Sequence, residues 1–547
     1  MLRYLKTPEA LIFVVSVWIA LTCNLGFWRV IAESQPPGVL SSIIYFASFL
    51  VLAVGLISLV MLLLAWGPVT RVVLILALLI AAAAGYSTLT LGTLFDSGML
   101  TNIIETNSAE AVELLSPWLV AFIAVFALLP AIAVWRYRIL PRRVSVAVLQ
   151  RSVGLLLALA MIGGAIFTNQ KEIFSVARNH HELRHMIAPV NVISASYSLS
   201  SDLLETPAVY QSVAVDAEHA DATAEHRKPR VHVLVIGETA RAANFSLNGY
   251  AQMTNPELTG KPGVQFLEAQ SCGTATAVSL PCMFSIQEHA AFDRNMASNE
   301  DNLLDVIGRA GYEVFWIDNG NSCKGVCDRV SSEDVHSLNG PEVCPDGTCY
   351  DEILVEALQT KLRQVTGDTV IVLHQLGSHG PAYYRRYPET YRVFAPDCRS
   401  PDFTDCSQEE VSNAYDNTIL YTDHVIAKAI DVLQAASQDF QASLIYISDH
   451  GESLGERNMY LHGMPYKLAP AEQTTIPMIM WLSDGLLQQG QSMSTCAELA
   501  SISTVSHDNL FHTELGLLRI STTAYKPELD LFSGCRVLKR DQLHART

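Results

Sequence analysis

The chain has 547 residues, of which half are apolar and 16% are charged. Its length exceeds that of one small domain, so we expect two or more units, and its mean hydropathy of +0.24 is high for a soluble enzyme. Residues 1–180 contain 11 Lys and Arg against 7 Asp and Glu, a net charge of +4, whereas the rest of the chain carries −22. This acidic C-terminal part argues against nucleic-acid binding, which needs a basic surface.

Five apolar runs lie near the start of the chain, at residues 11–32, 42–66, 72–95, 118–135 and 153–167. Each approaches or exceeds the roughly 20 apolar residues that a helix needs to cross a bilayer. The first run is too long for a signal peptide, and four more follow it. Five successive buried helices with so little charge are uncommon in a soluble protein. The pattern therefore predicts an N-terminal α-helical membrane domain with five transmembrane helices.

The short loops between these runs differ in charge. The segments expected on the cytoplasmic side contain Arg3, Lys6, Arg71, Arg136, Arg138, Arg142, Arg143 and Arg151. The loop at 96–117 has four acidic residues and no Lys or Arg. Because cytoplasmic loops are enriched in Lys and Arg, this loop and everything after about Thr168 should lie outside.

The same reasoning predicts three parts of the chain. Residues 1–168 form the five-helix transmembrane domain, 169–229 a connector with a bridging helix and linker, and 230–547 a domain outside the membrane. The connector contains the basic and imidazole side chains Lys171, Arg178, His180, His181, Arg184 and His185. They indicate either a surface helix near lipid head groups or an ordinary solvated helix face. The polar stretch at 216–230 is typical of a linker.

Cysteines are concentrated in the outer part. Cys23 lies in the first apolar run, and the other ten are Cys272, Cys282, Cys323, Cys327, Cys344, Cys349, Cys398, Cys406, Cys496 and Cys535. An even number in an oxidising compartment indicates disulfides. Close spacing suggests the pairs 272–282, 323–327, 344–349 and 398–406, which leaves 496 with 535. The alternative is a zinc site at 323, 327, 344 and 349, although these spacings differ from a standard four-cysteine cluster.

The outer part alternates strand and helix patterns. Short continuous apolar runs, typical of buried parallel strands, lie at 231–236, 313–317, 369–373, 443–447 and 476–481. Helical patterns lie between them at 302–309, 351–362 and 413–435. This alternation predicts an α/β domain with a mainly parallel sheet.

Polar clusters follow three of these strands. The first strand is followed by Glu238, the third by His374 and His379, and the fourth by Asp449 and His450. In such sheets, functional residues gather at the carboxyl ends of the strands. Glutamate, aspartate and histidine supply ligands that suit Zn²⁺. The sequence therefore predicts a zinc site made by Glu238, Asp449 and His450.

A threonine offers a nucleophile for this site. Thr276 lies in the segment SCGTATA, and the residues after it can continue as a helix. Metal coordination activates a weak hydroxyl nucleophile, and a helix N-terminus favours a bound phosphoryl group. Each feature alone has an ordinary explanation: an Asp-His pair can be structural, Thr276 a loop residue and His379 a turn residue. The combination at three strand ends favours a catalytic site.

The chain resembles a known family at several segments. They are 235–250 (VIGETARAANFSLNGY), 271–285 (SCGTATAVSLPCMFS), 323–330 (CKGVCDRV), 373–388 (LHQLGSHGPAYYRRYP), 415–424 (YDNTILYTDH), 448–456 (SDHGESLGE) and 461–466 (LHGMPY). Together they are similar to the phosphoethanolamine–lipid A transferases, a family that includes chromosomal lipid A modifiers and mobile colistin-resistance enzymes. The resemblance covers essentially the whole chain and implies an alkaline phosphatase/sulfatase-like fold. A sulfatase itself is disfavoured, because no Cys-x-Pro-x-Arg motif surrounds Thr276.

The resemblance implies a role for individual residues. Thr276 matches a nucleophile that carries a covalent phosphoethanolamine group, and Glu238, Thr276, Asp449 and His450 match the principal zinc site. His379 and His462 match histidines that hold the phosphate or bind a second zinc, and Lys324 matches a lysine that faces the substrate pocket. Asn102, Thr106 and Glu110 match residues that bind the donor's head group. Their spacing predicts that they share one helix face.

The function implied is transfer of phosphoethanolamine from phosphatidylethanolamine to a lipid A phosphate, which confers polymyxin and colistin resistance. The expected location is the bacterial inner membrane, with a monomeric chain whose catalytic domain lies in the periplasm. Two alternatives keep the chemistry but change a substrate: a core sugar or periplasmic glucan as acceptor, or phosphoglycerol as the donated group. A third is a non-catalytic membrane sensor or assembly factor that kept the fold.

Overall fold

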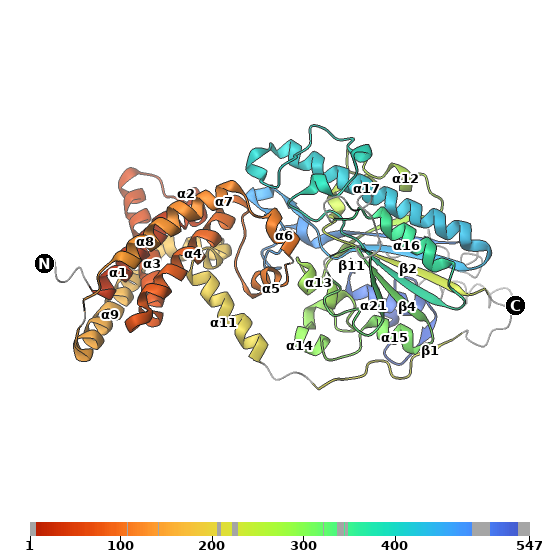
Figure 1. Ribbon diagram of the computed structural model, residues 1–547, viewed down its shortest axis with the longest axis horizontal. Helices are drawn as coiled ribbons and strands as arrows, with labels where there is room; N and C mark the ends of the chain where they lie inside the picture. The colour runs from red at the N-terminus through yellow and green to blue at the C-terminus, as the bar shows by residue number, and fades with distance from the viewer. Residues whose placement is uncertain are drawn as a thin grey trace. The chain divides into compact units, whose positions relative to one another are not determined.

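The structure is a computed structural model that describes residues 7–106, 108–140, 142–204, 209–220, 228–320, 322–335, 344, 348–483 and 504–533. The chain forms two compact units (Figure 1). The helical unit comprises Met1–Ile104, Leu114–Leu204 and Gly455–Tyr460. The sheet unit comprises Glu105–Glu113, Glu205–Leu454 and Leu461–Thr547.

The N-terminal third of the chain is helical. Its helices are α1 (Pro8–Thr22), α2 (Leu25–Glu33), α3 (Val39–Leu64), α4 (Thr70–Thr90), α5 (Ser97–Glu105), α6 (Ser108–Glu113), α7 (Pro117–Ile123), α8 (Leu129–Arg136), α9 (Val144–Thr168), α10 (Gln170–Asn179) and α11 (Val190–Leu204). By length and composition, Val39–Leu64, Gly67–Thr90, Pro117–Arg136 and Val144–Thr168 can each cross a membrane. The first predicted span is the pair α1 and α2, which is bent by 60°. The fifth span is longer than predicted, because its helix already begins at Val144.

The bend between α1 and α2 is built around the buried side chain of Asn24. Its amide nitrogen donates to the carbonyl oxygens of Ile19 (3.0 Å) and Ala188 (3.1 Å). Its amide oxygen accepts from the backbone nitrogen of Ala188 at 2.7 Å. Polar groups inside a bilayer need internal partners. These bonds provide partners for polar groups at the break and so reduce its free-energy cost.

A second irregularity lies between α7 and α8, where Ala124–Leu128 forms a π-helical turn. Pro130 has no N–H to donate to the carbonyl oxygen of Phe126, four residues earlier. The indole nitrogen of Trp18 on α1 donates to this oxygen instead, at 3.0 Å. The bond satisfies a backbone group that lipid could not satisfy.

The sheet unit is built on one eight-stranded sheet with the order β11-β3-β10-β7-β2-β6-β4-β5. The strands are β2 (Arg230–Gly237), β3 (Gln265–Gln270), β4 (Glu313–Asp318), β5 (Ser331–Asp334), β6 (Thr369–His374), β7 (Gln441–Ser448), β10 (Thr475–Leu482) and β11 (Val505–Ser506). The five predicted strands are confirmed as β2, β4, β6, β7 and β10. Strands β7, β2, β6, β4 and β5 are parallel, whereas β10 is antiparallel to both β7 and β3.

Helices cover both faces of this sheet. In Figure 1, α16 (Glu352–Leu362) and α17 (Gln408–Ala435) lie over one face, and α15 (Leu303–Arg309) and α21 (Asp508–Leu517) lie over the other. The three predicted helices are α15, α16 and α17. Capping boxes begin α15 at Asn302 and α17 at Ser407, so α17 starts earlier than the apolar pattern predicts. The remaining short elements are α12 (Pro256–Thr259), α13 (Thr276–Met283), α14 (Arg294–Ala297), α18 (Ala471–Thr474), β1 (Glu218–His219), β8 (Ser453–Leu454), β9 (Tyr460–Leu461) and β12 (Ile520–Ser521).

Four disulfides lie in the sheet unit. They join Cys272 to Cys282, Cys323 to Cys327, Cys344 to Cys349 and Cys398 to Cys406. These are the four local pairs predicted from spacing, and the alternative of a four-cysteine zinc site is wrong because the sulfurs are paired with each other. Cys496 and Cys535 lie outside the described residues.

Candidate active site

Two neighbouring strands end in potential metal ligands. β2 ends at Gly237 and is followed by Glu238, while β7 ends at Ser448 and is followed by Asp449 and His450. The strands are parallel and pair Gly237 with Ser448, so the residues after them meet at one edge of the sheet. Glu238, Asp449 and His450 are buried, and one ligand atom from each lies within 4.8 Å of the others.

The atoms that these three side chains present to one another are all hydrogen-bond acceptors. His450 Nδ1 lies 2.9 Å from the carbonyl oxygen of Gly451, which can only accept, so Nδ1 carries the proton. Burial lowers the pKa of His450 to about 4, so the ring is neutral near pH 7 and Nε2 is an acceptor. This Nε2 lies 3.4 Å from Asp449 Oδ2 and 3.5 Å from Glu238 Oε1. The three acceptors repel one another unless a cation lies between them.

Asp449 gives a second indication of a cation site. Its Oδ1 accepts hydrogen bonds from the backbone nitrogens of His450 (2.7 Å) and Thr239 (3.3 Å). Its Oδ2 is buried and accepts no hydrogen bond from any residue that the structure describes. A buried carboxylate oxygen without a donor is costly. Because carboxylate oxygens and one imidazole nitrogen suit Zn²⁺, the residues present fit a zinc ion.

Thr276 lies beside this group as the first residue of α13. Its hydroxyl oxygen is 3.0 and 3.2 Å from the two carboxylate oxygens of Glu238 and 3.3 Å from His450 Nε2. The start of a helix favours a bound anion. The position therefore suits a threonine that accepts a phosphoryl group.

Two links hold the Thr276 helix in place. The Cys272–Cys282 disulfide joins the loop before α13 to the helix itself. The hydroxyl of Ser279, one turn after Thr276, donates to the carbonyl oxygen of Asp449. The helix that begins at Thr276 is thus tied directly to the residue that follows β7.

Gly237 is required by close packing at the end of β2. A Cβ atom at this position would lie 2.3 Å from the hydroxyl oxygen of Tyr446 on β7. Glycine leaves the space that this buried tyrosine occupies, so Glu238 can follow the strand without displacing its neighbour.

Three histidines gather at the site. The ring centroid of His462 lies 4.5 Å from that of His450 and 5.5 Å from that of His379. His462 Nδ1 is 2.9 Å from Glu452 Oε2, and the other oxygen of Glu452 accepts from the hydroxyl of Tyr383 at 2.7 Å. With Nδ1 as donor to a carboxylate, Nε2 is the ring nitrogen left for a substrate or a second ion.

Lys324 lies in the loop closed by the Cys323–Cys327 disulfide and has a positive φ of 50°. Its ammonium group lies 3.6 Å from Glu105 Oε2 and 3.5 Å from the carbonyl oxygen of the same residue. The structure therefore places Lys324 against Glu105, apart from the hydrogen bonds around Thr276.

Asn102, Thr106 and Glu110 do not share one helix face, and that expectation is wrong. Asn102 lies on α5, which ends at Glu105, and Glu110 lies on α6, which begins at Ser108. Thr106 lies between the helices. Thr, Asn and Ser, the residue types at 106–108 of the sequence, favour turns and caps over helix interiors, which agrees with a break here.

Sequence reasoning missed His507, which supports the site from behind. Its Nδ1 accepts from the backbone nitrogen of Cys272 at 3.0 Å, and its Nε2 donates to the carbonyl oxygen of Ser448 at 2.9 Å. Burial lowers the pKa of His507 to about 4, and the neutral ring fills both roles. Like the other site residues, His507 directly follows a strand, β11. This strand has only two residues, so no apolar pattern in the sequence predicts it.

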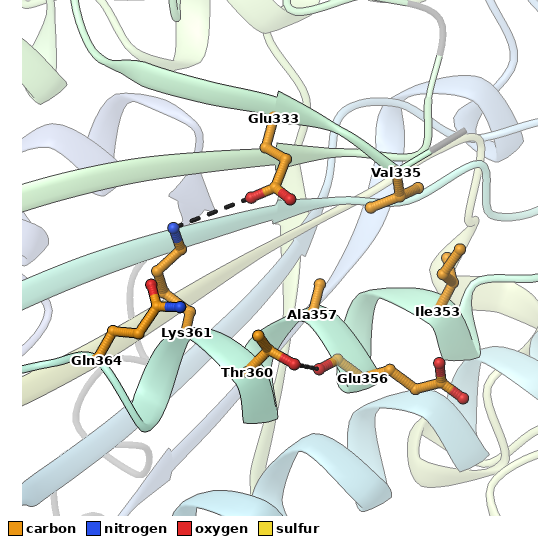
Figure 2. Close-up of a pocket in the computed structure, with 8 residues that line it drawn as sticks. All are labelled: Glu333, Val335, Ile353, Glu356, Ala357, Thr360, Lys361 and Gln364. Carbon is orange, nitrogen blue, oxygen red and sulfur yellow. Dashed lines mark hydrogen bonds and ion pairs between the residues drawn. The ribbon is translucent and has the colours of Figure 1, made fainter. Parts of the chain in front are cut away.

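A separate pocket of about 370 Å³ lies elsewhere on the sheet unit. Figure 2 shows it between β5 and α16, where Lys361 forms an ion pair with Glu333 at 3.9 Å. Its lining residues include none of those around Thr276. The chemistry at the strand ends, rather than this pocket, therefore defines the candidate site.

Two family models match the chain. Residues 52–203 match the family described as phosphoethanolamine transferase EptA/EptB, and residues 230–520 match the sulfatase family. The second match confirms the sulfatase-like fold expected for the outer part of the chain.

Curated relatives match along nearly the full length. Phosphoethanolamine transferase EptA of Salmonella typhimurium is 38% identical over 98% of this chain and 99% of its own. Phosphatidylethanolamine transferase Mcr-2 of Escherichia coli is 34% identical over 96% of this chain and 97% of its own.

A solved structure shares the whole architecture. The integral membrane protein lipooligosaccharide phosphoethanolamine transferase A (EptA) from Neisseria meningitidis matches with a TM-score of 0.92 and 37% identity. The match covers 96% of this chain and 98% of that one. With the apolar spans, the sulfatase-like domain and these relatives together, the chain belongs to the phosphoethanolamine transferase family of integral membrane proteins.

Proposed function

We propose that this chain transfers phosphoethanolamine from phosphatidylethanolamine to a phosphate of lipid A through a phospho-threonine at Thr276. The observation that carries the proposal is the position of the Thr276 hydroxyl, within 3.3 Å of both Glu238 and His450. The acceptor and donor are supported by the family resemblance and by the names of relatives that match nearly the whole chain.

Glu238, Thr276, Asp449 and His450 would hold a zinc ion. A bound Zn²⁺ acts as a Lewis acid that lowers the pKa of a coordinated hydroxyl and polarises the phosphodiester. The converging acceptor atoms and the unbonded Asp449 Oδ2 support this assignment.

The first step forms the bond between Thr276 Oγ1 and phosphorus and breaks the bond from phosphorus to the diacylglycerol oxygen. The Thr276 hydroxyl gives its proton to Glu238, whose carboxylate already accepts its hydrogen bond. The leaving diacylglycerol oxygen needs a proton, which His462, oriented by Glu452, is placed to supply.

The second step reverses these roles on a different substrate. An oxygen of the lipid A phosphate attacks phosphorus, and the bond from phosphorus to Thr276 Oγ1 breaks. Thr276 recovers its proton from Glu238, and the attacking phosphate hydroxyl gives its own proton to His462, which lost one in the first step, so the enzyme returns to its starting state. The acceptor gains an ammonium group, so its surface attracts cationic polymyxins less strongly.

We assign the remaining predicted residues to substrates. His379 and His462 hold the phosphate or bind a second zinc, and Lys324 faces the substrate. Asn102, Thr106 and Glu110 bind the donor's head group. In this proposal residues 1–168 anchor a monomer in the bacterial inner membrane, residues 169–229 connect the domains, and residues 230–547 form the catalytic domain in the periplasm.

The test is the mass spectrum of lipid A from cells that express this chain or its Thr276→Ala variant. The native chain should add the mass of phosphoethanolamine, and Thr276→Ala should add none. Thr360→Ala, an exposed threonine on α16, is the matched control and should behave as the native chain does. Full transfer by Thr276→Ala would refute the nucleophile. Unmodified lipid A with the native chain would refute the acceptor and direct the search to core sugars and glucans.

A further inference from the structure

Arg386 connects two parts of the sheet unit that are far apart in sequence. One terminal nitrogen of its guanidinium lies 2.6 Å from Glu113 Oε2, and its Nε donates to the carbonyl oxygen of His379 at 2.7 Å. The side chains of Arg386 and Glu113 are only 5% and 9% exposed. A single buried guanidinium thus bridges the 105–113 segment and the backbone of a site histidine.

The other end of the 105–113 segment is held by charge as well. Glu105 forms ion pairs with Arg294 at 2.5 Å and with Lys324 at 3.6 Å. Both ends of the segment that carries Thr106 and Glu110 are therefore anchored to the rest of the sheet unit by carboxylates.

The two arginines that reach Glu113 differ in exposure and in contact distance. Arg385 also reaches the Glu113 carboxylate, at 3.6 Å, but its side chain is 47% exposed. An exposed pair at this distance is screened by water and contributes little. Arg386 is buried and forms a direct contact, so removal of its partner would leave an uncompensated buried charge.

The shape of the guanidinium explains why an arginine is found here. Its planar fork directs separate N–H groups along fixed directions, so one side chain can bind a carboxylate and a carbonyl at once. Because Glu113 fixes the plane of the fork, it also fixes where Nε meets the His379 carbonyl oxygen. The His379 ring in turn lies against that of His462.

We propose that Arg386 is a positioning residue for His379, and that Glu113 orients Arg386 so that placement of the 105–113 segment is coupled to the geometry of the site. The proposal rests on the function proposed above, because His379 matters only if it holds the phosphate or an ion. Arg386 acts through His379 and contacts none of the reacting atoms itself.

The experiment measures steady-state transfer from fluorescent phosphatidylethanolamine to lipid A by the full-length protein in detergent, together with its unfolding temperature. The variants are Arg386→Lys, Arg386→Gln, Glu113→Gln and the exchanged pair Glu113→Arg/Arg386→Glu. Arg385→Gln is the matched control, since it removes a neighbouring arginine that reaches the same carboxylate.

Arg386→Lys should lower kcat on the order of 10- to 100-fold with little change in KM, because a misplaced group close to the reaction has an effect of that size. Glu113→Gln should lower kcat in the same direction and add nothing further in an Arg386→Gln background. Arg385→Gln should retain native kcat.

The exchanged pair separates positioning from simple anchoring. It restores opposite charges between positions 113 and 386, but glutamate cannot donate to the His379 carbonyl. Unfolding temperature should therefore recover towards that of the native chain while kcat stays low. Recovery of both would show that the pair only anchors the segment, and native kcat in Arg386→Lys would also overturn the proposal. If the native chain itself transfers nothing, the proposed function fails and this inference falls with it.

Discussion

The residues around Thr276 are arranged so that their charges oppose folding in the absence of a cation. The acceptor Nε2 of the neutral His450 lies within 3.5 Å of a carboxylate oxygen of both Glu238 and Asp449, and Asp449 Oδ2 has no donor among the described residues. A ligand that binds only the folded state stabilises it in proportion to the logarithm of its concentration. Stability therefore offers a readout of metal binding that does not depend on turnover.

Removal of metal with a chelator should lower the unfolding temperature of the full-length protein, and added Zn²⁺ should restore it. At a zinc concentration about 100 times Kd the stabilisation is about 2.7 kcal/mol. Asp449→Asn should make the unfolding temperature insensitive to both treatments, because it removes a ligand and the repulsion together. Asp439→Asn, at an exposed position, should respond as the native chain does. An equal response in both variants would place the metal elsewhere.

A second residue-scale effect belongs to Asp423 on α17. Burial raises the pKa of Asp423 to about 7, although the backbone nitrogens of Glu257 and Leu258 donate to its carboxylate. The nearby charge of Glu257 contributes to this rise in pKa. The unfolded carboxyl ionises near pH 4, so between about pH 4 and 7 the folded state holds a proton that the unfolded state has released.

Stability from Asp423 is therefore greatest below about pH 4 and is lost as pH rises to about 7, by up to about 1.4 kcal/mol for each pH unit. Asp423→Asn keeps an acceptor and cannot ionise, so its unfolding temperature should fall less than that of the native chain between pH 5 and 8. The measurement is thermal unfolding of the full-length protein across that range. Parallel curves for the two proteins would contradict the assignment.

The sequence predicted the residues around Thr276 but not the residues that bind to and orient them. The sequence indicates Glu238, Asp449 and His450 because they follow short apolar runs that are typical of buried strands, and Thr276 because it precedes a predicted helix. Arg386, Tyr383 and Glu113 act through partners 7, 69 and 273 positions away. No local pattern encodes such separations, so these contacts could be seen only in the folded chain.

At the scale of elements, Gly85 on α4 lies in close contact with the bend between α1 and α2. A Cβ atom at Gly85 would lie 1.8 Å from the carbonyl oxygen of Cys23. Small residues allow such close backbone contact between membrane helices. The bend and this glycine therefore form one structural feature.

Gly85→Ala should destabilise the protein although alanine is the better helix former. The propensity gain is about 1 kcal/mol, but the overlap is with rigid backbone, and overpacking of this kind costs about 1–3 kcal/mol or more. Gly163→Ala on α9 is the matched control, since among the described residues nothing beyond its chain neighbours and its own helix backbone lies within 4 Å of the added Cβ. We expect a lower unfolding temperature in detergent for Gly85→Ala only. A rise in both variants would mean that helix propensity outweighs the contact with Cys23, and an equal fall in both would mean that this contact does not decide the outcome.

The elements that sequence predicted well are those with strong local patterns. β2, β6 and β7 are buried along their whole length, and their continuous apolar runs revealed them. β5 has the sequence SSED and is largely exposed, so no apolar pattern predicts a strand there. Its backbone is a strand because it pairs with β4. The bend at Asn24 was missed because its bonds reach Ala188, 164 positions away.

At the scale of the whole chain, an ion cluster decides how many times the helical unit crosses the membrane. Glu9 at the start of α1 pairs with Arg142 at 2.6 Å, just before α9, and with Arg151 at 3.3 Å within α9. The starts of α1 and α9 therefore lie at the same end of the helical unit. If α1 and α2 turned back without crossing, the three spans that follow them would place the start of α9 at the opposite end. We infer that the bent pair crosses, which makes five spans.

Five crossings would place the N-terminus and Arg138 on one side of the membrane, and Gln35 and the residues that follow α9 on the other. In a Cys23→Ser background, Gln35→Cys should react with a membrane-impermeant maleimide in spheroplasts, and Arg138→Cys should react only after lysis. An N-terminal epitope should be protected from protease until lysis, because it shares the side of Arg138. An epitope digested in intact spheroplasts while Arg138→Cys stays protected would mean that α1 and α2 turn back. The Glu9 cluster would then have to join opposite faces of the membrane, which its contact distances forbid.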